Sequence, residues 1–459
     1  MLPSLASINP ASFYSAISAP MISFKHMYLK ALPLFLTGSA ALFTNWTDTY
    51  VSSFFGAPAV AAVGICGMMF FVLFSFSNGF SIAIQSFTAG FLTSRKNNEV
   101  LDAFVVCLVL GVSLALILTT ASIYFLEDIL MFMNPDAEVR TAARQYLEYL
   151  LYATPFYYVC SSARGLLISV GKAWIVSYIG IGTQVVNAIA TVVLAFGWAG
   201  APKLGVSGIG FGTFIAFALA SMFYVLAALQ AISRQKLRVG VLSFPLIMEI
   251  VGKAFLSASQ STIYALGIFT SYWIVGHLSV LALAVYQVIT QATLIPIYAA
   301  NALGSVAISQ VGQAVGAKDQ SGAQQVGMKM ISGAAYPIVI YALLVMLISE
   351  DILILLLGEA LNEPQLIMVF TLSCLILPLN IAGAVANYVL QGAQLFGRVW
   401  TVSAVTQWLV FLPLAYVFGV LMNYSLAGVI FADFIYRSSL FFVQYSFWKG
   451  YSEPALANP

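Results

Sequence analysis

The chain contains very few charged residues. Lys and Arg number 18 and Asp and Glu 16 among 459 residues, so 7% of the chain is charged, whereas soluble domains carry about 25%. Hydrophobic residues make up 61% of the chain, and its mean hydropathy is +0.97. This composition excludes a soluble globular protein. The net charge of +2 does not indicate a nucleic-acid partner, and we expect none.

Motifs that mark common enzymes and pumps are also missing. The sequence has no H-E-x-x-H motif, no Walker loop and no close pair of carboxylates. Its two histidines, His26 and His277, lie far apart, and its four cysteines are not spaced for a metal site or a disulfide framework. We therefore predict no enzyme, no metal site and no bound cofactor. Without a nucleotide-binding loop the chain is not a self-contained ATP-driven pump, so an ion gradient is the expected energy source.

The chain does contain a series of long hydrophobic stretches. A helix needs about 20 apolar residues to cross a bilayer, and twelve stretches reach that length. They cover residues 29–54, 58–82, 100–126, 139–164, 173–198, 204–232, 252–278, 280–304, 323–349, 364–391, 398–422 and 424–448. The sequence therefore predicts an all-α polytopic protein with twelve transmembrane helices, located in the inner or plasma membrane of the cell.

The second half of the chain repeats the first. Gly171–Ser177 (GKAWIVS) matches Gly397–Ser403 (GRVWTVS) 226 residues later (397 − 171 = 226). Three more short matches occur in the same order at nearly the same offset: GAPAVAA with GHLSVLA, SIAI with SVAI, and GIGFGTF with GVIFADF. Because six spans per half is an even number, both halves have the same orientation. We predict two six-helix bundles related by a parallel repeat, with a binding site between them.

The distribution of charge predicts the orientation in the membrane. The predicted parts are an N-terminal tail or interfacial helix (residues 1–28), a six-helix lobe (29–232), a linker (233–250), a second lobe (251–448) and a C-terminal tail (449–459). We assign fifteen of the 18 basic residues to one face of the membrane, Arg437 among them, and eight acidic residues to the other. Because cytoplasmic loops carry an excess of Lys and Arg, we predict that both termini are cytoplasmic.

Among the acidic residues inside the predicted spans, we consider Asp48 and Asp433 as candidates for function. A carboxylate at membrane depth costs at least about 2.5–3.5 kcal/mol on insertion scales, so such residues are candidates for function. Asp48 lies in the first span among polar neighbours. We predict that it binds a proton or Na⁺, because burial favours a neutral carboxyl while hydroxyl and amide donors favour the carboxylate; the alternative is a structural acid with satisfied hydrogen bonds. An ion pair with Arg437, four residues later on the same helical face, explains Asp433.

Several segments resemble the multidrug and toxic compound extrusion (MATE) family. Asn187 and the stretch Gly200–Thr213 (GAPKLGVSGIGFGT) are similar to the family's fifth-to-sixth span signature, and Val311–Lys318 (VGQAVGAK) is similar to the loop after its eighth span. Asp48, ahead of Phe54-Phe55-Gly56, matches the family's first-span acid. The resemblance covers about residues 28–448. It implies a cation-coupled antiporter that exports amphipathic organic compounds from the cytoplasm through a V-shaped cavity between two lobes.

The resemblance also implies which residues couple the cation. In the DinF-like branch an acid matching Asp48 works with polar residues matching Tyr146, Asn187 and Thr213, and a second acid stands where this chain has Thr191. In the NorM-like branch, acids of the seventh and tenth spans bind a cation, and those positions fall near two neutral residues here. The chain is thus closer to the DinF-like branch but lacks the second acids of both, which favours one coupled proton over Na⁺. Candidates for the substrate cavity are Asn45, Gln184, Tyr264, Gln287 and Asn380, of which Tyr264 and Asn380 mark the two NorM-like positions.

Other functions stay open at this stage. A lipid-linked oligosaccharide flippase of the same superfamily usually has a strongly cationic cavity. Here the basic residues that we consider within the spans are Arg164 and Arg437, and we place both towards the cytoplasmic end. A dedicated exporter of one natural product would have a specialised cavity of this kind. An intramembrane enzyme would need a paired acid, a metal cluster or a nucleophile with a base. We expect a monomer whose partners are a small amphipathic organic substrate and the lipid bilayer.

Overall fold

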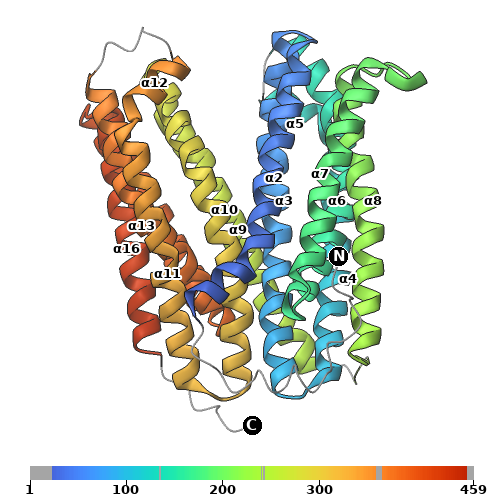
Figure 1. Cartoon of the computed structure of the whole chain (residues 1–459). Coiled ribbons are helices and arrows are strands. Elements are labelled where there is room, and N and C mark those ends of the chain that lie inside the picture. Colours follow the sequence, from blue (N-terminus) through green and yellow to red (C-terminus); the bar gives the residue numbers. More distant parts are fainter. Residues whose placement is uncertain (1–22, 134–135, 239, 241–242, 358–363, 452–459) are drawn as a thin grey trace.

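The computed structural model describes residues 23–133, 136–238, 240, 243–357 and 364–451. Twelve long helical segments in this part of the chain form two lobes of six (Figure 1). The N-terminal lobe consists of α2 (Phe24–Ser53), α3 (Ala57–Thr93), α4 (Asn97–Tyr124), α6 (Ala137–Ser169), α7 (Ala173–Phe196) and α8 (Val206–Arg234). The C-terminal lobe consists of α9 (Phe244–Gly276), α10 (Val280–Gly316), α11 (Gln320–Leu347), α13 (Pro364–Gly392), the segment Phe396–Leu421 and α16 (Ser425–Lys449). The predicted all-α fold of two six-helix bundles is confirmed.

Two of the twelve segments are more polar than a typical membrane span. Among the described residues, ten segments are apolar enough to cross a bilayer by their own composition, and α6 and α9 are the exceptions. Both are rich in Ser, Thr and Tyr. Helix α6 packs against α3, α4 and α8, while α9 packs against α3 and the start of the segment Phe396–Leu421. Polar spans are tolerated where they face other helices rather than lipid, so these two helices bring polar groups into the interior of the lobes.

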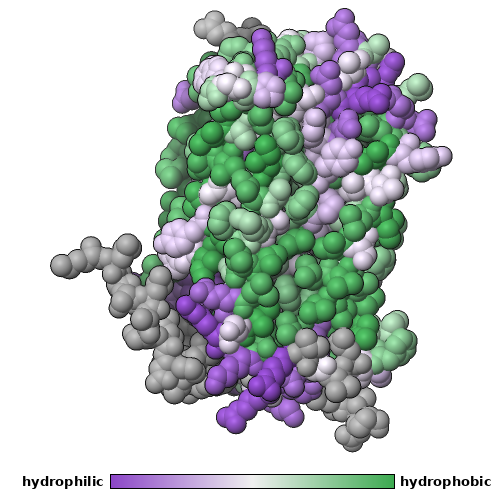
Figure 2. Space-filling view, turned by 90° about the vertical axis from the view of Figure 1, so that its right-hand side faces the viewer, coloured by the Kyte–Doolittle hydropathy of each residue, from purple (hydrophilic) through white to green (hydrophobic). Residues whose placement is uncertain are grey.

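The outer surface carries an apolar belt. Figure 2 shows hydrophobic residues over the middle of one face and hydrophilic residues towards its two ends. One side of α8 exposes Leu219, Met222, Phe223, Leu226 and Leu229. These residues recur every three or four positions, which is the pattern of a helix side that faces lipid chains.

Two short helices that the sequence analysis did not predict lie at one end of the lobes. Figure 1 shows α5 (Leu126–Met133) and α12 (Ser349–Leu357) at the top, where they follow α4 and α11. They begin with the acidic pairs Glu127-Asp128 and Glu350-Asp351, which are 223 residues apart (350 − 127 = 223). The pairs therefore belong to the internal repeat. Acidic residues stabilise the first turn of a helix by interacting with its dipole.

The predicted eleventh span is helical but is not a continuous α-helix. It consists of α14 (Phe396–Ala404), the π-helical segment η2 (Val405–Phe411), α15 (Leu412–Tyr416) and the π-helical segment η3 (Val417–Leu421). Pro413 explains part of this irregularity, because proline has no N–H group and its ring clashes with the carbonyl four residues earlier, that of Leu409. π-Helical turns inside α-helices are rare and occur frequently at functional sites.

The segment that connects the two lobes is shorter than predicted. Helix α8 ends at Arg234 and α9 begins at Phe244, inside the predicted linker of residues 233–250. Ser243 caps α9 by accepting a hydrogen bond from the Leu246 N–H at 3.4 Å. Within the connection, the Gly240 N–H donates to the buried carboxylate of Asp102 on α4 at 2.9 Å. Gly240 is therefore fixed to the N-terminal lobe.

The lobes meet along the ends of α3, α9 and α10 that adjoin the basic loops. Gly79 of α3 lies against α9, where a Cβ atom would come within 2.2 Å of the Ala258 backbone. Ser86 of α3 donates to the Gln391 carbonyl of α13 at 2.7 Å. Figure 1 shows the helices of the two lobes diverging from this contact towards α5 and α12. Helices α3 and α10 extend to Thr93 and Gly316, beyond the predicted ends of their spans, and this extra length contributes to the contact.

Helix α2 belongs to both lobes. Its first turns pack on the C-terminal lobe, where Met27 is buried among residues of that lobe and the Tyr28 hydroxyl donates to the Gly333 carbonyl of α11 at 2.6 Å. Its later turns pack on α7. Figure 1 shows this helix starting beside α11 of the C-terminal lobe and running up into the N-terminal one.

Candidate functional site

Asp48 is buried inside the N-terminal lobe. It lies in the last third of α2, and 6% of its surface is exposed. Its carboxylate accepts hydrogen bonds from the Thr191 hydroxyl of α7 at 3.2 Å and from the Tyr146 hydroxyl of α6 at 3.4 Å. None of the ion pairs among the described residues includes Asp48. A buried carboxyl that has neutral donors and no paired cation is suited to change its protonation state.

The other predicted coupling residues lie beside this carboxylate. Asn187 is one helical turn before Thr191 on α7, and its Nδ2 donates to the Thr213 hydroxyl of α8 at 2.9 Å. Asn187 is 3% exposed, and its Oδ1 has no partner among the described residues. Asp48, Tyr146, Asn187, Thr191 and Thr213 thus form one polar cluster, contributed by α2, α6, α7 and α8.

A second hydrogen bond joins the same two helices one turn away. The Thr44 hydroxyl of α2 donates to Gln184 Oε1 of α7 at 2.7 Å. Thr44 precedes Asp48 by four residues and Gln184 precedes Asn187 by three, so both lie on the faces that carry the cluster. The sequence analysis missed Thr44, although its position four residues before Asp48 was a usable signal.

Three glycines allow α8 to approach the helices that hold the cluster. They belong to the segment Gly208-Ile209-Gly210-Phe211-Gly212-Thr213. A Cβ atom at Gly210 would lie 2.5 Å from the Tyr146 carbonyl, and one at Gly212 would lie 2.6 Å from the Thr191 nitrogen. At Gly208 a Cβ atom would lie 2.6 Å from the backbone of α7. Side chains at these positions would push α8 away, so the glycines place Thr213 within reach of Asn187.

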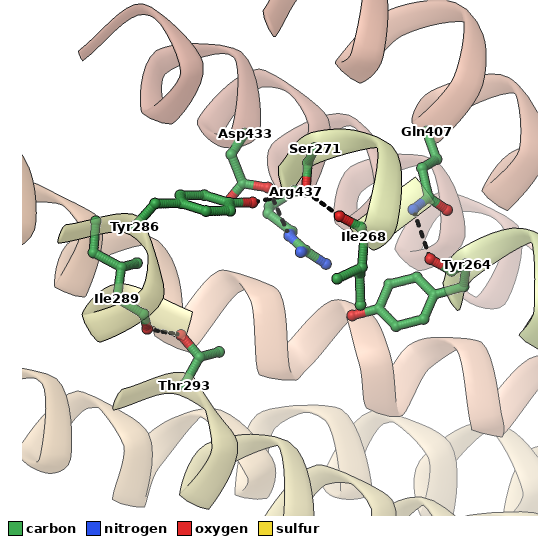
Figure 3. A network of polar contacts seen from close by, with 9 residues as sticks. All are labelled: Tyr264, Ile268, Ser271, Tyr286, Ile289, Thr293, Gln407, Asp433 and Arg437. Carbon is green, nitrogen blue, oxygen red and sulfur yellow. Dashed lines mark hydrogen bonds and ion pairs between the residues drawn. The ribbon is translucent and has the colours of Figure 1, made fainter. Parts of the chain in front are cut away.

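The predicted cavity residues do not form one group. Asn45 is exposed on α2, whereas Gln184 lies one helical turn from the N-terminal cluster and bonds to Thr44. In the C-terminal lobe, Gln287 is exposed and accepts from the Tyr272 hydroxyl at 2.6 Å, and Asn380 is buried on α13. Tyr264 of α9 lies beside the guanidinium of Arg437 (Figure 3). The structure therefore assembles the coupling residues but distributes the cavity candidates over both lobes.

Arg437 is not where the sequence analysis placed it. Twelve residues separate it from each end of α16 (437 − 425 = 12 and 449 − 437 = 12), so it lies halfway along the span and not on the basic face or towards the cytoplasmic end. The expected ion pair is present, because Arg437 Nε donates to Asp433 Oδ1 at 3.1 Å. The placement was wrong because a positive charge was taken to mark a loop, whereas the partner four residues away allows the cation to stay at membrane depth.

Comparison with protein families identifies the chain. The MatE family matches residues 33–193 and again residues 257–417, and the two matches are 224 residues apart (257 − 33 = 224). The chain belongs to the MatE family. The double match confirms the predicted internal repeat, since each half of this MatE protein is one copy of the family's unit.

Curated relatives of this MatE protein include proteins named as transporters and multidrug resistance proteins. A probable multidrug resistance protein NorM from Agrobacterium fabrum is 30% identical over 44% of this chain and 43% of its own length. Another, from Bradyrhizobium diazoefficiens, is 25% identical over 65% of each chain. The uncharacterized transporter YisQ of Bacillus subtilis is 21% identical over 90% of this chain and 92% of its own length. The match to the first of these relatives spans less than half of that protein.

Solved structures share the fold over nearly the whole chain. A MATE transporter in a bent conformation superposes with a TM-score of 0.84 at 16% identity, over 94% of this chain and 95% of that one. An outward-facing multidrug resistance MATE transporter of the MOP superfamily gives 0.83 at 17% identity, over 94% and 96%. At these identities the likeness establishes the two-lobed fold.

Proposed function

We propose that this MatE protein exports amphipathic organic compounds from the cytoplasm in exchange for protons, by alternating access. The observation that carries the proposal is the buried Asp48 carboxyl, which receives two neutral hydrogen bonds and belongs to none of the described ion pairs. Export of multiple drugs is consistent with the names of the curated relatives. From the composition of the polar cluster we propose that the chain is closer to the DinF-like than to the NorM-like branch, and that it functions as a monomer.

The proposed orientation follows from the charge of the loops. The loops that join α3 to α4 and α10 to α11 carry Arg95, Lys96 and Lys318, whereas α5 and α12 at the opposite end carry acidic pairs. By the positive-inside rule the end at which the lobes meet is cytoplasmic. Both termini are then cytoplasmic in the plasma membrane, and the conformation described here is closed on the cytoplasmic side.

One proton per cycle provides enough energy for useful export. An elementary charge that crosses about 100 mV releases roughly 2.3 kcal/mol, and a pH difference of one unit adds roughly 1.4 kcal/mol. The sum of about 3.7 kcal/mol supports a gradient of several hundredfold for a neutral solute. A second acidic residue in the cluster is therefore not required.

Reconstituted protein tests this proposal. Proteoliposomes loaded with a cationic dye such as ethidium are given either a pH gradient or a Na⁺ gradient, and dye movement is followed by fluorescence. We expect transport with the pH gradient, and we expect Asp48→Asn to abolish it while the protein remains folded in the membrane. Wild-type rates in Asp48→Asn would refute the role of Asp48, and transport that responds only to Na⁺ would refute proton coupling.

A further inference from the structure

A second polar cluster lies inside the C-terminal lobe, at the middle of α16. Its centre is the ion pair of Asp433 and Arg437. Both residues lie on the face of α16 opposite the exposed Phe431, Phe434 and Phe442. The pair therefore points into the lobe and away from lipid (Figure 3).

Neither charged side chain is sealed off. Arg437 exposes 15% and Asp433 23% of its side-chain surface. Because both residues lie on the inward face of α16, this exposed surface is on the side of the helix that faces the rest of the lobe. Charged groups at membrane depth nearly always face a protein interior or a water-filled cavity. The pair therefore keeps exposed surface with which a ligand can make contact.

Polar groups from three other elements surround the pair. Tyr264 and Ser271 come from α9, Tyr286 from α10 and Gln407 from η2 (Figure 3). The Ser271 and Tyr286 hydroxyls lie 2.9 Å apart, and the Tyr264 hydroxyl lies beside the Arg437 guanidinium. Tyr264 also accepts at its backbone carbonyl from Gln407 Nε2 at 3.1 Å. Residues from α9, α10, η2 and α16 thus form one polar cluster around the ion pair.

Gln407 supplies an independent sign of a ligand. It is 2% exposed, and its Oε1 has no partner among the described residues. A buried acceptor without a donor is costly, so the atom is available for a donor that a ligand brings. Gly267 of α9 lies directly against this side chain, since a Cβ atom there would collide with the Gln407 amide. The π-helical segment and Gly267 together hold the amide in this position.

The unused donors of Arg437 define the chemistry of that ligand. A guanidinium has five N–H groups in a planar fork. Asp433 takes the donor on Nε, the Tyr264 hydroxyl forms a hydrogen bond with the guanidinium, and the centroid of the Tyr436 ring lies 4.6 Å from Cζ. The two hydrogen bonds leave other N–H groups on the terminal nitrogens, and such groups bind carboxylates. Lysine would not offer this fork.

We propose that the cluster of Tyr264, Ser271, Tyr286, Gln407, Asp433 and Arg437 binds exported compounds that carry a carboxylate together with an N–H donor. Arg437 holds the carboxylate, and Gln407 Oε1 accepts from the N–H group. The pair of Asp433 and Arg437 is neutral overall, so the preferred compounds are zwitterions of no net charge. The physiological role of this site rests on the proposed export function, but ligand binding does not.

Two dyes that differ by one methyl ester test the proposal. Rhodamine 110 has a free carboxylate and aromatic amino groups, whereas rhodamine 123 is its methyl ester. Binding of each dye to the purified full-length protein is measured by fluorescence polarisation at equilibrium, without a gradient. We expect Arg437→Gln to weaken rhodamine 110 binding by about tenfold or more and to change rhodamine 123 binding less than about twofold.

Two further variants make the test decisive. Arg144→Gln removes an arginine near the start of α6 whose ion pair with Glu127 is exposed, and it should leave both affinities unchanged. The double variant Asp433→Asn/Arg437→Gln leaves no unpaired charge in the lobe, so it reports on binding if the single variant does not fold. It should lose the preference for rhodamine 110 in the same way.

Three results would overturn the proposal: no binding of rhodamine 110 to the wild type, an unchanged ratio of the two affinities in the Arg437 variants, or an equal loss of both dyes. Failure of proton-driven transport would leave a carboxylate preference intact. The two proposals therefore fail separately, since one is measured at equilibrium and the other requires a gradient.

Discussion

Thr191 occupies the position at which the resemblance implies a second acid, and its hydroxyl donates to Asp48 at 3.2 Å. A second carboxylate would repel the first, whereas a hydroxyl donor stabilises the ionised form of Asp48. Tyr146 supplies another donor from the opposite side. In the proposed mechanism, the cluster therefore controls one proton with neutral groups.

Replacing this donor should move the pH dependence of transport. Thr191→Val keeps the shape of the side chain and removes the hydroxyl. Because the carboxylate then loses a hydrogen bond, Asp48 should keep its proton to higher pH, and the midpoint of the pH–transport profile should shift upwards by about one unit. The profile is measured in proteoliposomes at constant pH gradient.

The matched control for this variant lies on the same helix. Thr183 is buried on α7, and its hydroxyl donates to the Ile179 carbonyl at 2.7 Å. Thr183→Val should leave the midpoint in place. An equal shift in both variants would mean that the effect comes from α7 as a whole, and no shift in Thr191→Val would remove Thr191 from the coupling site.

The residues of the N-terminal polar cluster could be predicted because a carboxyl group inside an apolar span is rare and the family signature includes its neighbours. Asp48, Tyr146, Asn187, Thr191 and Thr213 are all in one cluster. The C-terminal cluster could not be predicted, since its assembly depends on tertiary contacts. The irregular turn that places Gln407 and the inward face of α16 that carries Arg437 have no local signal beyond the spacing of Asp433 and Arg437.

At the scale of elements, α8 packs on α6 and α7 through glycines. Gly212 faces Thr191, and a Cβ atom there would lie 2.6 Å from the Thr191 nitrogen and 2.9 Å from its hydroxyl oxygen. Neither backbone can move without displacing the polar cluster. The glycine is thus a requirement of the site as well as of the packing.

Adding one methyl group at this position should destabilise the protein. Gly212→Ala should cost about 1–3 kcal/mol of overpacking, offset in part by about 1 kcal/mol of better helix propensity. We expect a melting temperature several degrees below that of the wild type in detergent, together with an altered pH profile because Thr191 is displaced. A melting temperature at or above the wild-type value would show that α7 and α8 separate without cost.

Gly182 provides the control, since it lies on α7 with nothing within 4 Å of an added Cβ atom. Gly182→Ala should be neutral or slightly stabilising. A loss of stability in both variants would mean that glycine is needed in these helices for a reason other than close packing.

Most helices could be predicted from the sequence, because a span is defined by the length of its apolar stretch. Every predicted span has a counterpart among the helical segments of the structure. The short helices α5 and α12 were not predicted, since each continues a long hydrophobic stretch and the break lies only at Phe125 and Ile348. The π-helical turns near Pro413 were likewise unpredictable in detail, because a proline indicates an irregularity without specifying its form.

At the scale of the whole molecule, the closed contact between the lobes is made by small residues. Ala89 of α3 and Gly312 of α10 lie on opposite lobes, and a Cβ atom on Gly312 would be 3.0 Å from the Ala89 Cβ. This separation is close to the range of about 3.5–4.5 Å found in disulfides. The four native cysteines are buried.

A disulfide at this contact should stop transport reversibly. Ala89→Cys/Gly312→Cys is expected to cross-link under mild oxidation and to lose nearly all transport, because the lobes can no longer separate at the basic end. Reduction with dithiothreitol should restore it. Each single cysteine variant serves as the control and should transport under oxidising conditions; full activity of the cross-linked protein would rule out separation of the lobes at this contact.

Helix α2 connects the two lobes, which move relative to one another in the proposed alternating access, and its length is fixed. Near its start, Tyr28 is hydrogen-bonded to Gly333 of the C-terminal lobe. Asp48, twenty residues later, is hydrogen-bonded within the N-terminal lobe. At 1.5 Å per residue these two anchors are about 30 Å apart along the helix. Any rotation of one lobe against the other must therefore bend α2 or break the contact at Tyr28 or at Asp48. Pro33 lies near Tyr28, at a point where a hydrogen bond of the helix is already missing. A proton that binds to Asp48 in the proposed mechanism therefore acts on the same helix that contacts the C-terminal lobe.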